Sequence, residues 1–251
     1  MKNFGSQEKN GGFAQNVVAV FARAPRVGEV KTRLAKSVGE AYARDIYAAM
    51  LREVFASAQR VASQIADGEV VVFYTPQNAF SHDAFARDEN SLSGLWNGAR
   101  YPQSDGDLGM RLHDCFEYLR ANGAQNIVAI GSDAPDLPLD YLVQAFDELS
   151  RRDWVFGPTG DGGFYLMGAS CALTLEVFCD VRWSSENTLQ DVLSNADNLS
   201  LSRSSLRLWH DVDTIDDLHA LHRRLQIGKG VAPHTHRVLD VVLQNEKAPQ
   251  D

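Results

Sequence analysis

A run of basic side chains directly after a short apolar segment is the strongest chemical signal in the sequence. The fourteen positions from 23 to 36 hold one acid, Glu29, and five bases: Arg23, Arg26, Lys31, Arg33 and Lys36. Because the whole chain has a formal net charge of -9, this local reversal indicates either a solvated basic loop or an anion site. The loop follows the apolar residues 17–21, and open α/β sheets bind ligands beyond the carboxyl ends of their strands. This position favours an anion site, and the expected ligand is a polyphosphate.

Two acidic positions also follow apolar segments and could bind a divalent cation. Asp133 comes directly after residues 126–130 (NIVAI), and Asp213, together with Asp211, follows residues 206–209 (LRLW). Hard cations such as Mg²⁺ or Mn²⁺ take oxygen ligands and usually bind through one or two carboxylates plus substrate phosphates. Asp133 and Asp213 could therefore share one ion. For each residue alone, a role in capping a turn or a helix explains its presence equally well.

Two glycine-rich loops and one aromatic residue supply further candidates. In GPTGDGGFYLMG, the glycines around Asp161, including Gly162 and Gly163, would let a ligand approach the backbone. Asp161 could orient a sugar hydroxyl or act as a base, although DGG is also a strong hairpin-turn signal. In QSDGDLGMRL, Asp107 precedes a helix whose free amides could contact phosphate or a nucleobase, or it belongs to a plain loop. Trp183 in VRWSSENT resembles a stacking wall for a ligand.

Several other site classes are excluded by motif and composition. Residues 28–32 (GEVKT) lack the glycine spacing of a P-loop, and no GxGxxG occurs anywhere in the chain. The cysteines, Cys115, Cys171 and Cys179, are odd in number and have no CxxC spacing, so neither a disulfide framework nor a zinc knuckle is indicated. A single dense cationic stretch in an acidic chain also argues against nucleic-acid binding.

Alternating strand-like and helix-like segments must position these residues. Strands are expected at 17–21, 69–75, 126–130, 154–157, 164–167 and 206–209, and helices at 40–65, 108–119, after Pro138, after Thr214 and at 238–243. Such alternation predicts an α/β fold with right-handed crossovers and a mostly parallel sheet. The segments 154–157 and 164–167, separated by a turn-rich stretch, could form a hairpin and make the sheet mixed. Thr214 and Asp217 have the spacing of a capping box.

Length and composition indicate one globular domain. The chain has 251 residues, of which 44% are hydrophobic and 23% charged, so we expect a disordered leader at 1–15 and a single domain at 16–251. The leader has no apolar core suited to a signal peptide. No apolar run approaches the roughly 20 residues that cross a bilayer. We therefore expect a cytoplasmic protein without a membrane span, and leave the choice between monomer and homodimer open.

The order of the motifs resembles a known family of bacterial enzymes. Between about residues 17 and 225 the chain reads FARAPRVGEVKTRLA, QSDGDLGMRL, GSDAPDLP, GPTGDGGFYLMG, VRWSSENTL and DVDTIDDL. In this order they resemble GT-A-fold glycosyltransferases, some of them assigned to arsenosugar biosynthesis. The chain is more distantly similar to phospholactate guanylyltransferases and molybdopterin nucleotidyltransferases. The resemblance implies a Rossmann-like nucleotide-diphospho-sugar transferase fold, in which helices flank a mostly parallel mixed sheet.

The resemblance also implies roles for individual residues. The basic loop would hold the diphosphate of the nucleotide, one metal ion would bind at the two separated carboxylates, and Asp161 would face the transferred group. The expected site therefore has Asp161 and Lys31 as catalytic residues, Asp133 and Asp213 as ligands of Mg²⁺ or Mn²⁺, and Arg23, Gly28, Arg33, Asp107, Gly162, Gly163 and Trp183 as substrate-binding residues.

One departure from the family pattern keeps three functions open. Many glycosyltransferases of this fold carry an Asp-x-Asp metal motif, whereas Ser132-Asp133-Ala134 leaves a single carboxylate at this point. We expect metal-dependent glycosyl transfer from a nucleotide-diphospho-sugar to a small acceptor. The lone aspartate favours an alternative, nucleotidyl transfer from a nucleoside triphosphate to a phosphorylated small molecule. A sugar-nucleotide-binding module without turnover is the third hypothesis.

Overall fold

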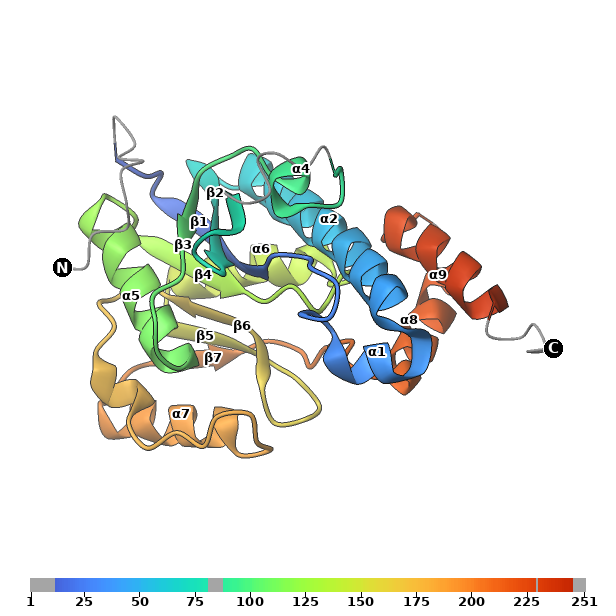
Figure 1. Ribbon diagram of the computed structural model, residues 1–251. Coiled ribbons are helices and arrows are strands. Elements are labelled where there is room, and N and C mark those ends of the chain that lie inside the picture. Colours follow the sequence, from blue (N-terminus) through green and yellow to red (C-terminus); the bar gives the residue numbers. More distant parts are fainter. Residues whose placement is uncertain (1–11, 81–87, 229, 246–251) are drawn as a thin grey trace.

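The computed structural model describes residues 12–80, 88–228 and 230–245. Within these residues, a seven-stranded sheet has the strand order β3-β2-β1-β4-β6-β5-β7 (Figure 1). Its strands are β1 (Asn16–Arg23), β2 (Gly68–Thr75), β3 (Arg100–Pro102), β4 (Asn126–Ile130), β5 (Trp154–Pro158), β6 (Phe164–Ala169) and β7 (Arg203–Ser205). The helices are α1 (Thr32–Val38), α2 (Glu40–Gln64), α4 (Leu92–Leu95), α5 (Leu108–Ala121), α6 (Leu139–Leu149), the 3₁₀ helix η1 (Leu175–Phe178), α7 (Thr188–Asn198), α8 (Ile215–Ile227) and α9 (Pro233–Asn245).

The sheet is mixed and mostly parallel, as the sequence predicts. Strand β1 pairs in parallel with both β2 and β4, and β3 extends the parallel part beyond β2. Strand β6 runs antiparallel to β4 and to β5, so β5 and β6 form the expected hairpin. Because β1 and β4 are parallel neighbours, the loops that follow them leave the sheet at the same edge. The basic loop and Asp133 are therefore brought together by topology.

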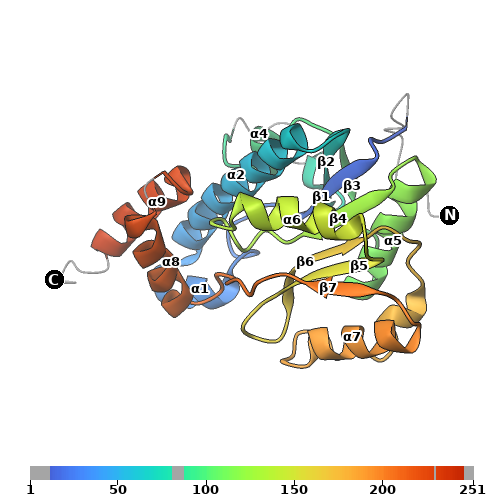
Figure 2. The same cartoon turned by 180° about the vertical axis from the view of Figure 1, so that it is seen from behind.

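Helices cover both faces of the sheet (Figures 1 and 2). Side chains alternate along β1, so Val18 and Val20 pack in one core with α2 and α6. Val17 and Ala19 pack in the other core with α5, η1 and α7. Burial on both faces explains why β1 is a continuous apolar run. A third apolar cluster joins α1, α2, α8 and α9 at one end of the molecule.

One expected strand is wrong, and the short elements β3, α1, α4 and η1 have no counterpart among the expected segments. The last strand is β7 (Arg203–Ser205), not 206–209. Its sequence, RSS, is polar and lies at the sheet edge, so no apolar pattern marks it. Of the apolar residues that suggested the strand, Leu208 is 49% exposed, and Trp209 forms only an isolated bridge with Thr159. The short elements β3 and α1 carry no clear periodicity either.

Residues 1–11 of the expected leader lie outside the described residues, whereas Phe13 is described and is buried. Thr214 and Asp217 form the capping box of α8, as predicted. The helix expected at 238–243 is the inner part of α9. Among the described helices, none has the length together with the apolar character that a bilayer crossing requires.

Candidate functional site

A pocket of about 760 Å³ opens at the edge of the sheet where β1 and β4 end. Its walls come from segments far apart in the chain: the loop between β1 and α1, the residues after β4, the first turn of α5 and the segment before α8. Six sequence-predicted site residues line it: Arg23, Gly28, Lys31, Arg33, Asp133 and Asp213. Asp211, noted beside Asp213 in the sequence, lines it as well.

Lys31 joins these segments at the floor of the pocket. Its Nζ donates hydrogen bonds to Asp133 Oδ1 at 2.5 Å, to the Val212 carbonyl at 2.5 Å and to Asp213 Oδ1 at 3.0 Å. These partners use all the donors of a lysine ammonium. The Lys31 side chain is 4% exposed, whereas those of Asp133 and Asp213 are 41% and 47% exposed. The cation is thus enclosed, and the carboxylates remain open to the pocket.

The backbone of the basic loop turns through unusual conformations to deliver Lys31. Lys31 has φ 47° and ψ 44°, in the left-handed region, directly before α1. Gly28 has φ 77°, which suits a residue without a side chain. A left-handed conformation at a residue other than glycine costs about 1–2 kcal/mol. The bonds of the Lys31 ammonium offset this cost, so the turn and the ion pairs stabilise each other.

The electrostatics of the pocket follow from this crowding of charges. Although burial alone would lower the pKa of Lys31, the carboxylates of Asp133 and Asp213 together hold it above its usual value. Burial and the nearby Asp133 carboxylate raise the pKa of Asp211 to about 7, although Lys31 opposes the shift. The pocket therefore combines a fixed positive charge with carboxyl groups that compete for it.

Tyr47 of α2 contacts both the end of β1 and the loop after β4, a role that the sequence did not reveal. Its hydroxyl accepts a hydrogen bond from the Arg23 backbone N–H at 3.0 Å and lies 2.9 Å from Ser132 Oγ. Burial, followed by the Asp133 charge, raises the pKa of Tyr47 to about 12, so the group stays neutral. Tyr47 is buried among the apolar residues of α2. In the sequence it has the helical spacing of these residues, so it cannot be told apart from an ordinary core residue.

A second wall of the pocket contains two polar residues that sequence reasoning missed. Gln103 is buried and donates a hydrogen bond to the Phe73 carbonyl at 2.9 Å. Arg111, in the first turns of α5, donates to the Gly106 carbonyl at 3.0 Å, and both residues line the pocket. Arg111 belongs to the QSDGDLGMRL motif. The motif therefore does contain a pocket residue, but the sequence singles out Asp107 in it and not Arg111.

Five predicted site residues do not line the pocket: Asp107, Asp161, Gly162, Gly163 and Trp183. Asp107 caps α5 by accepting the Met110 N–H at 2.9 Å. Asp161 stands in the β5–β6 turn, where it accepts from Thr159 Oγ1 at 2.5 Å and from the Gly163 N–H at 3.1 Å. Trp183 packs against Phe178 with ring centroids 6.0 Å apart.

The β5–β6 turn also explains why a glycine occupies position 162. Gly162 has φ 87°, and a Cβ atom at this position would overlap the backbone carbonyl of Glu186. The Gly162 carbonyl in turn accepts the Leu189 N–H at 2.9 Å. This glycine thus docks the turn on the start of α7. Asp161 remains electrostatically close to the pocket, since its charge contributes to the raised pKa of Asp211.

A buried ion pair supports the site from the α8 side. Asp136, the second acid of the GSDAPDLP motif, has a 3% exposed side chain and accepts from Arg224 Nε at 2.6 Å. Trp209 Nε1 also donates to Asp136, at 3.3 Å. These contacts tie α8 to the loop after β4. They thereby restrain the segment that carries Asp211 and Asp213 relative to Asp133.

Comparison with known proteins places this geometry in a structural context. The model of the DUF2064 family, described as "Uncharacterized protein conserved in bacteria", matches residues 58–185. A crystal structure from Desulfovibrio desulfuricans G20, provisionally named a nucleotide-diphospho-sugar transferase, is 25% identical with a TM-score of 0.80. That alignment covers 94% of this chain and 100% of the other. No match is found among curated protein sequences.

More distant structures share the fold alone. A cytidylyltransferase from Leptospira borgpetersenii has a TM-score of 0.52 at 14% identity. The alignment covers 95% of this chain and 99% of the cytidylyltransferase chain. The CMP:2-keto-3-deoxy-manno-octonic acid synthetase complexed with CTP has a TM-score of 0.51 at 12% identity. The alignment covers 86% of this chain and 100% of the synthetase chain. The fold expected from the sequence, that of nucleotide-diphospho-sugar transferases, is confirmed.

Proposed function

Since the chain belongs to the DUF2064 family and has the nucleotide-diphospho-sugar transferase fold, we propose that it is a metal-dependent glycosyltransferase. It moves a sugar from a nucleotide-diphospho-sugar to a small acceptor. The observation that carries the proposal is the convergence of Lys31, Asp133 and Asp213 in one pocket. An anion-binding loop and a cation-binding pair of carboxylates are the two parts that diphosphate departure requires.

The basic loop is proposed to bind and stabilise the leaving diphosphate. Arg23 and Arg33 are exposed in the pocket wall, so their guanidinium groups are available to phosphate oxygens. Lys31 adds a fixed positive charge at the floor of the pocket. As the bond between the anomeric carbon and the diphosphate oxygen breaks, negative charge accumulates on that oxygen. Preorganised cations stabilise it without having to rearrange.

Asp133 and Asp213 are proposed to hold Mg²⁺ or Mn²⁺. The residues fit such an ion, because both carboxylates already share one cation, the Lys31 ammonium, and both remain nearly half exposed. Their oxygens are the ligand type that these hard cations prefer. When bound, the ion would supply further positive charge to the diphosphate. Lys31 would keep the two carboxylates together whether or not the ion is present.

Asp161 is proposed as the base if the reaction inverts the anomeric configuration. Its carboxylate would accept the proton of the acceptor hydroxyl while the new glycosidic bond forms and the diphosphate departs. Hydrogen bonds from Thr159 and Gly163 support this proposal by holding the carboxylate in one orientation. Because Asp161 does not line the pocket, the acceptor would have to extend from the pocket to the β5–β6 turn.

The direct test measures release of nucleoside diphosphate. The protein is incubated with a panel of sugar nucleotides and small hydroxylated acceptors, with and without Mn²⁺. Metal-dependent release by the wild type, lost in Asp133→Asn and retained in Lys36→Met, is the expected result. Lys36 belongs to the same basic stretch of sequence but lies in the last turn of α1 and does not line the pocket. Absence of release with every combination of donor and acceptor would count against glycosyl transfer.

Nucleotidyl transfer is a second candidate, favoured by one specific observation. No other acid lies within two residues of Asp133 in the sequence, and Asp213, which shares the Lys31 ammonium with it, comes from a distant segment. This arrangement suits attack of a phosphorylated acceptor on the α-phosphate of a nucleoside triphosphate, with pyrophosphate leaving toward the basic loop. Pyrophosphate release from each triphosphate, measured with phosphorylated acceptors, separates the two reactions. Release of pyrophosphate without any release from sugar nucleotides would replace the first proposal with this one.

A further inference from the structure

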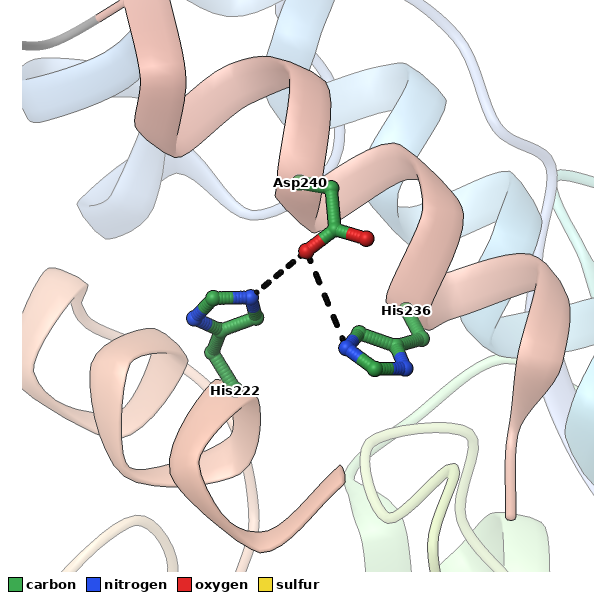
Figure 3. A group of neighbouring side chains, drawn as sticks. All are labelled: His222, His236 and Asp240. Carbon is green, nitrogen blue, oxygen red and sulfur yellow. Dashed lines mark hydrogen bonds and ion pairs between the residues drawn. The ribbon is translucent and has the colours of Figure 1, made fainter. Parts of the chain in front are cut away.

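A second group of metal-ligating side chains lies on α8 and α9. His222 Nε2 is 2.8 Å from Asp240 Oδ1, and His236 Nε2 is 3.7 Å from the same oxygen. One ligand atom from each of the three residues lies within 4.8 Å of the other two. Figure 3 shows both imidazole rings directed toward one carboxylate oxygen, one ring from each helix. None of the three residues lines the pocket described above.

The helix pair holds these side chains together through its apolar core. His236 and Asp240 are four residues apart on α9 and therefore share one side of that helix. On α8, Leu221 precedes His222, and on α9, Leu239 precedes Asp240. Both leucines are fully buried in the cluster that joins these helices to α2. The positions of the three polar residues are thus set by packing and do not depend on their mutual contacts.

Two imidazoles and one carboxylate form a donor set that suits Zn²⁺. Zinc binds histidine nitrogen and carboxylate oxygen at about 2.0–2.2 Å, so donors of a tetrahedral site lie about 3.3 Å apart. The separations of 2.8 and 3.7 Å lie on either side of this value. Magnesium and manganese prefer all-oxygen sites, so this cluster selects a different ion from the pocket carboxylates.

We propose that His222, His236 and Asp240 form a zinc site that links α8 to α9. The side chains of His236 and Asp240 are 31% and 49% exposed, which leaves access for the ion and for a water molecule as fourth ligand. Zinc bound there cross-links the two helices that carry the C-terminal part of the fold. The site stands independently of the proposed transferase function, because it uses none of the same residues.

Calorimetric titration of ZnCl₂ into the full-length protein tests the site. One zinc ion is expected to bind the wild type and the Asp133→Asn variant equally, which separates this site from the pocket. In His222→Ala and His236→Ala, the affinity should fall by at least about tenfold, since losing even an outer-shell partner costs 10–100-fold. His113→Ala is the matched control, because His113 also contacts an aspartate, Asp114 at 3.4 Å, but lies on α5.

A second measurement keeps the result interpretable if a variant folds poorly. Zinc should raise the melting temperature of the wild type and of His113→Ala, but not that of His236→Gln, which replaces the more exposed ring. Melting curves in EDTA show whether each variant is folded before metal is added. The proposal would be overturned if the wild type did not bind zinc. It would also be overturned if His222→Ala and His236→Gln bound zinc as tightly as His113→Ala does.

Discussion

At the scale of single residues, Lys31 has the largest expected influence on the pocket. Replacing it with methionine removes a cation that is shared by Asp133 and Asp213. The two carboxylates and Asp211 would then repel one another with only solvent to screen them. Breaking a buried pair costs about 3–5 kcal/mol, and the partial exposure of these acids reduces the expected loss to about 1–3 kcal/mol. Urea unfolding of Lys31→Met and of the control Lys36→Met measures this loss, and equal stabilities would refute the structural role of Lys31.

The buried ion pair between Asp136 and Arg224 is expected to stabilise the attachment of α8 to the loop after β4. Asp136→Asn keeps the shape of the side chain but leaves the Arg224 guanidinium, 27% exposed, without its buried counter-ion. We expect a loss of about 2–4 kcal/mol in the free energy of unfolding. The matched control is Asp140→Asn, because Asp140 lies in the first turn of α6, where loss of an N-terminal charge costs about 0.3–1 kcal/mol. A loss no larger than that of the control would show that α8 does not depend on this ion pair.

At the scale of elements, the docking of the β5–β6 turn on α7 depends on Gly162. Gly162→Ala would place a methyl group against the Glu186 carbonyl and would strain a backbone with φ 87°. We expect about 1–3 kcal/mol of destabilisation, together with displacement of Asp161. Gly160→Ala in the same turn is the control, since a Cβ atom there meets nothing within 4 Å. Similar melting temperatures for the two variants would contradict this packing.

The ion pair between Arg182, just before α7, and Asp191 of α7 is expected to make the stability of this region depend on pH. Hydrogen bonds from the Arg182 side chain and backbone lower the pKa of Asp191 to about 2. A carboxyl group whose pKa is lower in the folded protein stabilises it above the unfolded pKa of about 3.9. That contribution is lost as the pH falls through the folded pKa. The stability difference between wild type and Asp191→Asn should therefore be present at pH 5 and disappear toward pH 2. A difference that persists at pH 2 would contradict this ion pair.

At the scale of the whole molecule, the predictable features are those that depend on apolar pattern and strand order. The apolar run 126–130 coincides with β4, and the parallel pairing of β1 and β4 then brings Lys31 to Asp133 across 102 positions. The polar edge strand β7 had no such pattern and was missed. Composition also could not reveal that Asp107 caps a helix or that Trp183 packs against Phe178, because those contacts depend on side-chain direction.

The same convergence of distant segments predicts how a nucleotide stabilises the entire fold. A ligand that bridges Arg23 and Arg33 to Asp133 would tie β1, α1 and β4 together in the native state only. At 100 times its dissociation constant it adds about 2.7 kcal/mol, which raises the melting temperature by about 5–10 °C in a domain of this size. A thermal-shift screen of nucleoside diphosphates and sugar nucleotides with Mn²⁺ measures this increase. We expect it to shrink in Arg23→Ala and Arg33→Ala but persist in Arg26→Ala, since Arg26 does not line the pocket. An increase of equal size in all three variants would show that the nucleotide binds elsewhere.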